Sequence, residues 1–113
     1  MSARSEKFIN AGDREVRILF TNRAIAEAEG RLGKSVIQLA TEFDKGGTGV
    51  SEIAILLRAG MEAARREDRL GGNPISLDDA YRVLDEVGFT DVAIAVMTAI
   101  SEVLSYKQDQ EKN

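Results

Sequence analysis

The sequence lacks several residue types that carry chemistry in proteins. It has no cysteine, no histidine and no tryptophan in 113 residues, and a single proline. Without cysteine it can form no disulfide framework and no thiolate nucleophile or ligand. Without histidine it lacks the side chain that most often acts as a general base near neutral pH or binds a metal. We therefore expect a protein that is not an enzyme, has no catalytic residues or metal site, and needs no cofactor.

Long apolar runs and an excess of positive charge are also missing. No stretch approaches the roughly 18 consecutive apolar residues of a membrane helix, and residues 1–10 lack the apolar segment of a signal peptide. The formal net charge of -4 does not favour binding to a phosphate backbone. We expect a cytoplasmic protein with no membrane or nucleic-acid partner. With 43% hydrophobic and 30% charged residues, the composition is typical of one folded domain over residues 1–113.

Residues 1–20 predict a β-hairpin. Phe8 and Ile9 lead into the turn-forming run at 10–13, and the following residues alternate between apolar and mostly polar positions. The apolar positions that we expect to face inward are Val16, Ile18 and Phe20, and those between them are Glu15, Arg17 and Leu19. An isolated hairpin is marginal in water, so its apolar face should lie on the helices that follow or on another chain.

Residues 22–106 predict a helical core of about five helices, because apolar residues recur there at helical spacing. The first helix should stop at Gly33, since glycine often ends helices. The second should begin at Ser35 in a capping box with Gln38. A glycine-rich loop at 46–49 separates it from the third helix. The fold class is therefore mainly α, a small helical domain preceded by an N-terminal hairpin.

The third and fourth helices have clear amphipathic patterns. We expect Ser51 to cap the third helix, with Leu57 in its buried stripe. The charged residues expected to face water on this helix are Glu62, Arg65, Arg66 and Glu67. Ser76 and Asp79 suggest a capping box for the fourth helix, with Leu84 central in its buried stripe.

The last helix should run from near Thr90 to about Tyr106, followed by a charged tail at 107–113 that we expect to fray. Two apolar stripes lie side by side on it: Ala93, Met97, Ile100 and Leu104, and then Val92, Val96, Ala99 and Val103. One neighbouring helix cannot easily cover both stripes. If other elements cover the second stripe it is core. If not, it is a protein-binding patch for a homo-oligomer or for an apolar helical segment of a partner.

Two short motifs resemble ligand-binding sites but lack the residues that would hold calcium or phosphate. A segment beginning at Asp44 resembles a calcium loop, yet Gly46, Thr48 and Ile55 stand where calcium requires oxygen ligands. We therefore expect Asp44 to be a solvated loop residue. The run 33–35 looks like the end of a phosphate-binding loop, but a helix precedes it and the first glycine of that motif is absent. A helix stop followed by a helix cap accounts for it.

Charged clusters also have structural explanations. Asp78 and Asp79 fall in the first turn of a helix, where acidic side chains complement the helix dipole. Arg65, Arg66 and Arg69 alternate with acidic residues, which indicates a solvated face. The last two helices could form a DNA-binding helix-turn-helix, but the last one has no lysine or arginine before the tail. Such a helix cannot contact phosphates or guanines.

The order of these features resembles that of phage tail assembly chaperones. The run LFTNRAIAEAEGRLGKSVIQLA (residues 19–40) has a strand end that enters a helix, a Gly-Lys-Ser break and a short apolar helix. The segments SEIAILLRAGMEAARRED (51–68) and SLDDAYRVLDEVGFTDVAIAVMTAI (76–100) are similar to the later half of that family. The resemblance covers roughly residues 16–106.

The resemblance implies a small, mostly helical, non-enzymatic protein of a tailed phage, prophage or gene transfer agent. Such a protein binds the long, aggregation-prone tape measure protein and brings tail tube subunits to it in the host cytoplasm. It is not part of the finished particle. The alternative from the residues alone is a small helical adaptor or regulatory protein-interaction subunit. The position of the gene would separate the two, because a chaperone gene should lie between the tail tube and tape measure genes.

Overall fold

The computed structural model describes residues 3–69 and 71–106. Within them the chain forms an antiparallel hairpin, β1 (Arg4–Ala11) and β2 (Arg14–Thr21), followed by five helices. The helices are α1 (Asn22–Leu32), α2 (Val36–Asp44), α3 (Val50–Glu67), α4 (Leu77–Val87) and α5 (Phe89–Leu104). The predicted order of a hairpin and then helices is confirmed, and the class is α+β rather than purely helical. The predicted tail at 107–113 lies outside the described residues.

The hairpin turns at Gly12 and Asp13, and Ala11 pairs with Arg14 on either side of the turn. Gly12 has a φ of 69°, in the left-handed region that tight hairpin turns favour and that glycine adopts without steric cost. The turn is therefore shorter than the run at 10–13 suggested.

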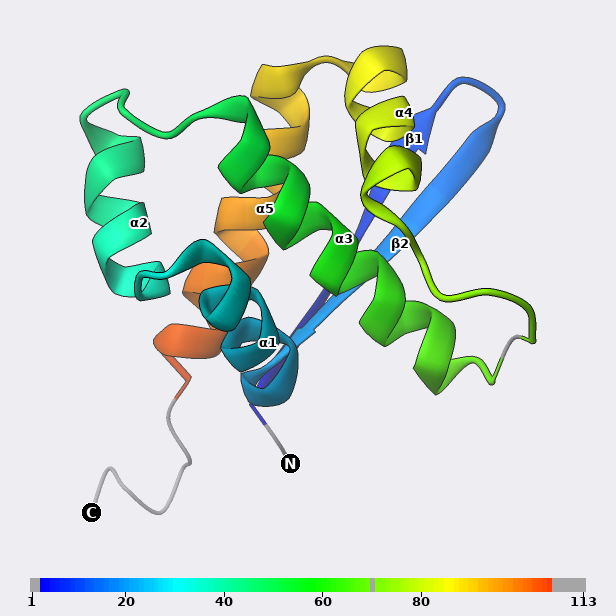
Figure 1. Cartoon of the computed structure of the whole chain (residues 1–113), viewed down its shortest axis with the longest axis horizontal. Helices are drawn as coiled ribbons and strands as arrows, with labels where there is room; N and C mark the ends of the chain where they lie inside the picture. The colour runs from blue at the N-terminus through cyan, green and yellow to red at the C-terminus, as the bar shows by residue number, and fades with distance from the viewer. Residues whose placement is uncertain (1–2, 70, 107–113) are drawn as a thin grey trace.

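The inner face of the hairpin packs on α3 and α5. Strand β2 contacts α3 and strand β1 contacts α5, and Figure 1 shows the hairpin passing behind α3. Ile18 and Phe20 are fully buried there, as predicted. Leu19 is buried as well, although the alternation placed it on the outer face. It lies beside Ala24 of α1 and Ala63 of α3, which cover that part of the strand.

Most helix ends follow the predicted local signals. Gly33 ends α1 with a φ of 72°, and the Ser35 hydroxyl accepts a hydrogen bond from the backbone N–H of Gln38 at the start of α2. The Ser76 hydroxyl accepts from Asp79 N–H, and the Asp79 carboxylate accepts from Ser76 N–H, so the capping box of α4 is confirmed.

The start of α3 differs from the prediction. Gly49 is its N-cap residue, and the Glu52 carboxylate accepts a hydrogen bond of 2.9 Å from Gly49 N–H. Ser51 lies inside the helix and does not cap it. Glu52 supplies the half of a capping box that reaches back to the N-cap backbone, and this interaction moves the helix start toward Gly49.

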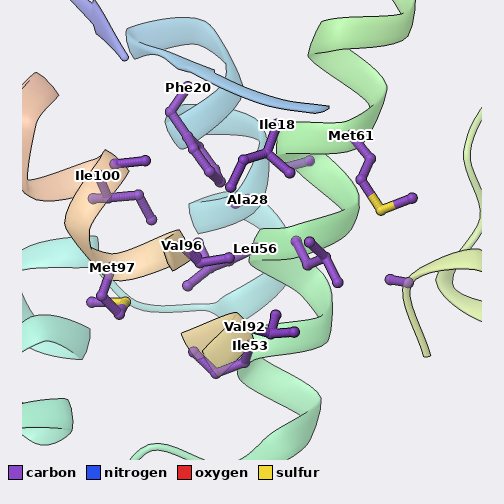
Figure 2. Packing of buried hydrophobic residues seen from close by; sticks show 14 of the residues in the cluster. Ile18, Phe20, Ala28, Ile53, Leu56, Met61, Val92, Val96, Met97 and Ile100 are labelled. Carbon is purple, nitrogen blue, oxygen red and sulfur yellow. The ribbon is translucent and has the colours of Figure 1, made fainter. Parts of the chain in front are cut away.

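The core lies between α3, α5 and the hairpin. Figure 2 shows Leu56 of α3 close to Val96 of α5, with Ile18 and Phe20 approaching from the hairpin side. Leu57 and Leu84 are buried, as predicted. Helix α5 contacts β1 on one side and α3 on another, so it is a central helix of the fold.

Within the described residues, no single helix has the length and apolar composition needed to cross a membrane. Helices α4 and α5 meet this criterion only when joined, and they are bent by 118° at the break between them.

Candidate protein-binding groove

The predicted binding patch on α5 is buried. Its four residues belong to the core cluster: Val92, Val96, Ala99 and Val103. Because several elements surround α5, both of its predicted stripes find partners over most of their length. The alternative that the second stripe is core therefore holds, and the prediction of an exposed patch at these residues is corrected.

A different face of α5 is open. Ile94 is 53% exposed and Leu104 is 44% exposed. Met97 and Ser101 lie between them at spacings of three and four residues, which place all four positions on one side of a helix. Leu104 belonged to the stripe that we expected to face the core, and Ile94 belonged to neither predicted stripe.

Helix α2 forms the other wall of this open face. Ala40 and Phe43 of α2 line two adjoining hollows with residues of α5, one of about 220 Å³ and one of about 310 Å³. We call the joined hollows the α2–α5 groove. Its apolar lining comprises Ala40, Phe43, Ile94, Met97, Ile100 and Leu104. In Figure 2, Met97 points away from Val96 and toward the α2 side of α5.

Helix α2 lies at the periphery of the fold (Figure 1). Among the elements of the described chain it has no extensive interface with another helix or strand, and Figure 1 shows it at the left edge of the molecule. Buried Val36 and Leu39 hold it to the core. Lys34 Nζ lies 2.9 Å from a carboxylate oxygen of Glu42 and 2.7 Å from one of Glu52, which ties α2 to the start of α3.

These contacts also set the charge of Lys34. The Glu52 carboxylate, and then that of Glu42, raise the pKa of the Lys34 ammonium above its usual value. The Lys34 side chain is therefore charged throughout the neutral range. Its ion pairs with Glu42 and Glu52 tie α2 to α3.

The two helices that border the groove carry only acidic charges in the described residues: Glu42, Asp44, Asp91 and Glu102. Glu42 is paired with Lys34, and Glu102 is paired with Lys7 at 2.8 Å. Asp44 was expected in a loop, but it is the exposed last residue of α2 and lines the groove beside Ile94. The groove is thus lined by apolar and hydroxyl side chains and is acidic at the end near Asp44.

Glu62 on α3 is a second departure from the sequence analysis. We expected it to face water, but it is 2% exposed. Its carboxylate accepts hydrogen bonds of 2.8 to 2.9 Å from Arg65, Arg66 and the backbone N–H of Ile75. These partners, Arg65 above all, lower its pKa to about 2. Glu62 therefore holds the segment before α4 against α3, and this role is structural.

The remaining motifs have structural roles. The run 33–35 forms a helix stop followed by a helix cap, as predicted, and not the end of a phosphate-binding loop that follows a strand. In residues 3–69 and 71–106 no group of three or more histidine, cysteine, aspartate or glutamate side chains is placed to hold a metal ion.

Comparison with known proteins gave no match to a family model, to a curated protein or to a solved structure.

Proposed function

We propose that the protein is a non-enzymatic tail assembly chaperone of a tailed phage, prophage or gene transfer agent. It binds the tape measure protein and helps to recruit tail tube subunits. The observation that carries this proposal is the α2–α5 groove, an open surface lined mainly by apolar side chains of two helices. Grooves with an apolar lining are surfaces on which amphipathic helices bind.

The shape of the groove suits a helical segment. From Ile94 to Leu104 its α5 wall is about 15 Å long, at a rise of about 1.5 Å per residue. A helix lying in an apolar groove makes contact through side chains at spacings of three, four and seven residues. About three turns of such a helix fill this length. Apolar helical segments of an aggregation-prone protein are therefore suitable occupants.

Coexpression with the tape measure protein encoded beside it tests the proposal. We expect the chaperone to raise the amount of tape measure protein in the soluble fraction and to copurify with it. Replacing Ile94 and Leu104 with serine should abolish both effects. Because these side chains are already about half exposed, the double variant should keep its fold and its melting temperature.

Val50→Ser is the matched control, since Val50 is exposed to a similar extent and does not line the groove. It should behave as the unchanged protein does. If the groove variant still copurifies with tape measure protein, the groove is not the binding site. If the unchanged protein binds no tape measure protein but captures another helical partner, the adaptor function replaces the chaperone function.

A further inference from the structure

The charges around the α2–α5 groove are unevenly distributed. Asp44 lines the groove next to Ile94, and Asp91 lies three residues before Ile94 on α5, which places it on the same side of that helix. Both carboxylates are exposed, and neither has an ion-pair partner in the part of the chain that the structure describes. Two unpaired negative charges thus stand at one end of an apolar groove.

The backbone of α2 adds to this negative end. Asp44 is the last residue of α2, and the C-terminus of a helix carries a partial negative charge from its free carbonyl groups. Lys45 follows directly and offsets part of this charge. The other two acidic residues of these helices, Glu42 and Glu102, are each paired with a lysine. Glu102 is bonded to Lys7 and Ser5 of β1, so its charge is directed to the hairpin.

We propose that the α2–α5 groove selects amphipathic helices whose apolar stripe is flanked by lysine or arginine, with the positive side chains near Asp44 and Asp91. This inference rests on the proposed function, because it names the chemistry of the helix that the same groove captures. Complementary charges near a binding surface raise the association rate and disfavour partners of the wrong sign. An acidic helix therefore meets repulsion at this end of the groove.

The same charges disfavour a second copy as the occupant. A second copy that offered its own α2 or α5 would bring helices that carry acidic residues and, in the described chain, no lysine or arginine. Asp44 and Asp91 would then face further negative charge. The groove accordingly favours a different, basic partner over a second copy that offers its α2 or α5.

Two designed peptides of about 14 residues, or about four helical turns, test this inference with the full chain. Both carry the same leucine stripe, and they differ only in flanking lysine or glutamate. Calorimetric titration at low salt should show at least about tenfold tighter binding of the lysine peptide. The ratio should fall as salt is raised, because exposed charge pairs are screened.

Variants separate the local effect from the overall negative charge of the protein. Asp44→Asn with Asp91→Asn should reduce the preference for lysine to about twofold or less. Asp13→Asn with Asp85→Asn removes the same net charge from exposed positions outside the groove. It should leave the preference unchanged. If the two pairs of variants reduce the preference equally, the groove charges have no special role and the inference is overturned.

The remaining outcomes distinguish this inference from the proposed function. If both peptides bind equally and Ile94→Ser with Leu104→Ser abolishes binding, the groove captures helices without charge selection, so only the inference fails. If the lysine peptide still binds the Ile94→Ser, Leu104→Ser variant, it binds elsewhere and the inference also fails. If neither peptide binds, the inference fails, and coexpression with the tape measure protein decides the proposed function separately.

Discussion

Gly60 is the point at which the hairpin and α3 approach most closely, and replacing it with alanine tests this packing. A Cβ atom at Gly60 would lie 2.8 Å from Cζ of Phe20 and 3.1 Å from Cβ of Ile18. Carbon atoms in contact prefer a separation of about 3.5 to 4.0 Å. Both neighbours are fully buried, so neither side chain can move into solvent to make room.

The expected cost follows from two opposing terms. Overpacking a well-packed core by one methyl group costs about 1 to 3 kcal/mol. Alanine in a helix interior is favoured over glycine by about 0.5 to 1 kcal/mol. Gly30 on α1 provides the control, because a Cβ there meets nothing within 4 Å. Gly30→Ala has only the favourable term, so the two variants should differ by about 1 to 3 kcal/mol, with Gly60→Ala the less stable.

Chemical denaturation followed by circular dichroism measures this difference directly. A difference of 1 kcal/mol corresponds to roughly 4 °C in melting temperature for a domain of this size. Phe20→Leu, which removes the ring that the new methyl group meets, should make Gly60→Ala less costly than it is in the unchanged protein. If Gly60→Ala is as stable as Gly30→Ala, α3 and β2 do not pack as described.

Three further predictions concern the core, the buried carboxylate and ligands. Truncating fully buried Leu57 to alanine should cost about 2 to 5 kcal/mol in a denaturant titration, whereas Glu86→Gln, at an exposed ion pair, should cost no more than about 1 kcal/mol. Glu62→Gln should cost about 2 kcal/mol at pH 7, since it removes charged hydrogen bonds. The folded-state pKa of Glu62, about 2, lies below its usual 4.5, so its contribution is present above pH 4.5 and is lost as the pH falls toward 2. The Glu62→Gln variant and the unchanged protein should therefore converge in stability at acidic pH, and a difference that stays constant would refute the assignment. Millimolar calcium or ATP should leave the melting temperature unchanged, because neither the segment after Asp44 nor the run 33–35 has the groups that these ligands need.

Local signals in the sequence predicted most element boundaries. The left-handed conformations at Gly12 and Gly33 end a strand and a helix, and the capping box at Ser76 and Asp79 begins another helix. Such signals operate within a few residues, so a sequence reveals them without knowledge of the fold. Ser51 was an exception, because Glu52 caps the backbone of Gly49, two residues before the serine that was expected to cap the helix.

Long-range packing decided what the sequence could not predict. Glu62 is buried because Ile75, thirteen residues later, returns to donate its backbone N–H to the carboxylate. Ile94 is exposed because none of the described elements packs extensively on its side of α5, and α2, the neighbouring helix, is tied to the start of α3 through Lys34 and Glu52. Periodicity shows how many apolar faces a helix has, but it does not show which elements cover them. The four residues predicted as a binding patch, Val92, Val96, Ala99 and Val103, are therefore core, and the open face of α5 is a different one.

Hydrogen-exchange mass spectrometry of the chain with and without the tape measure protein tests the central claim most directly. Capture of a helix in the α2–α5 groove should slow amide exchange in residues 36–44 and 94–104, which form its walls, because bound segments open less often. Exchange in the hairpin at 4–21 should stay the same. Unchanged exchange in α2 and α5, together with protection confined to the hairpin or to α4, would contradict the account.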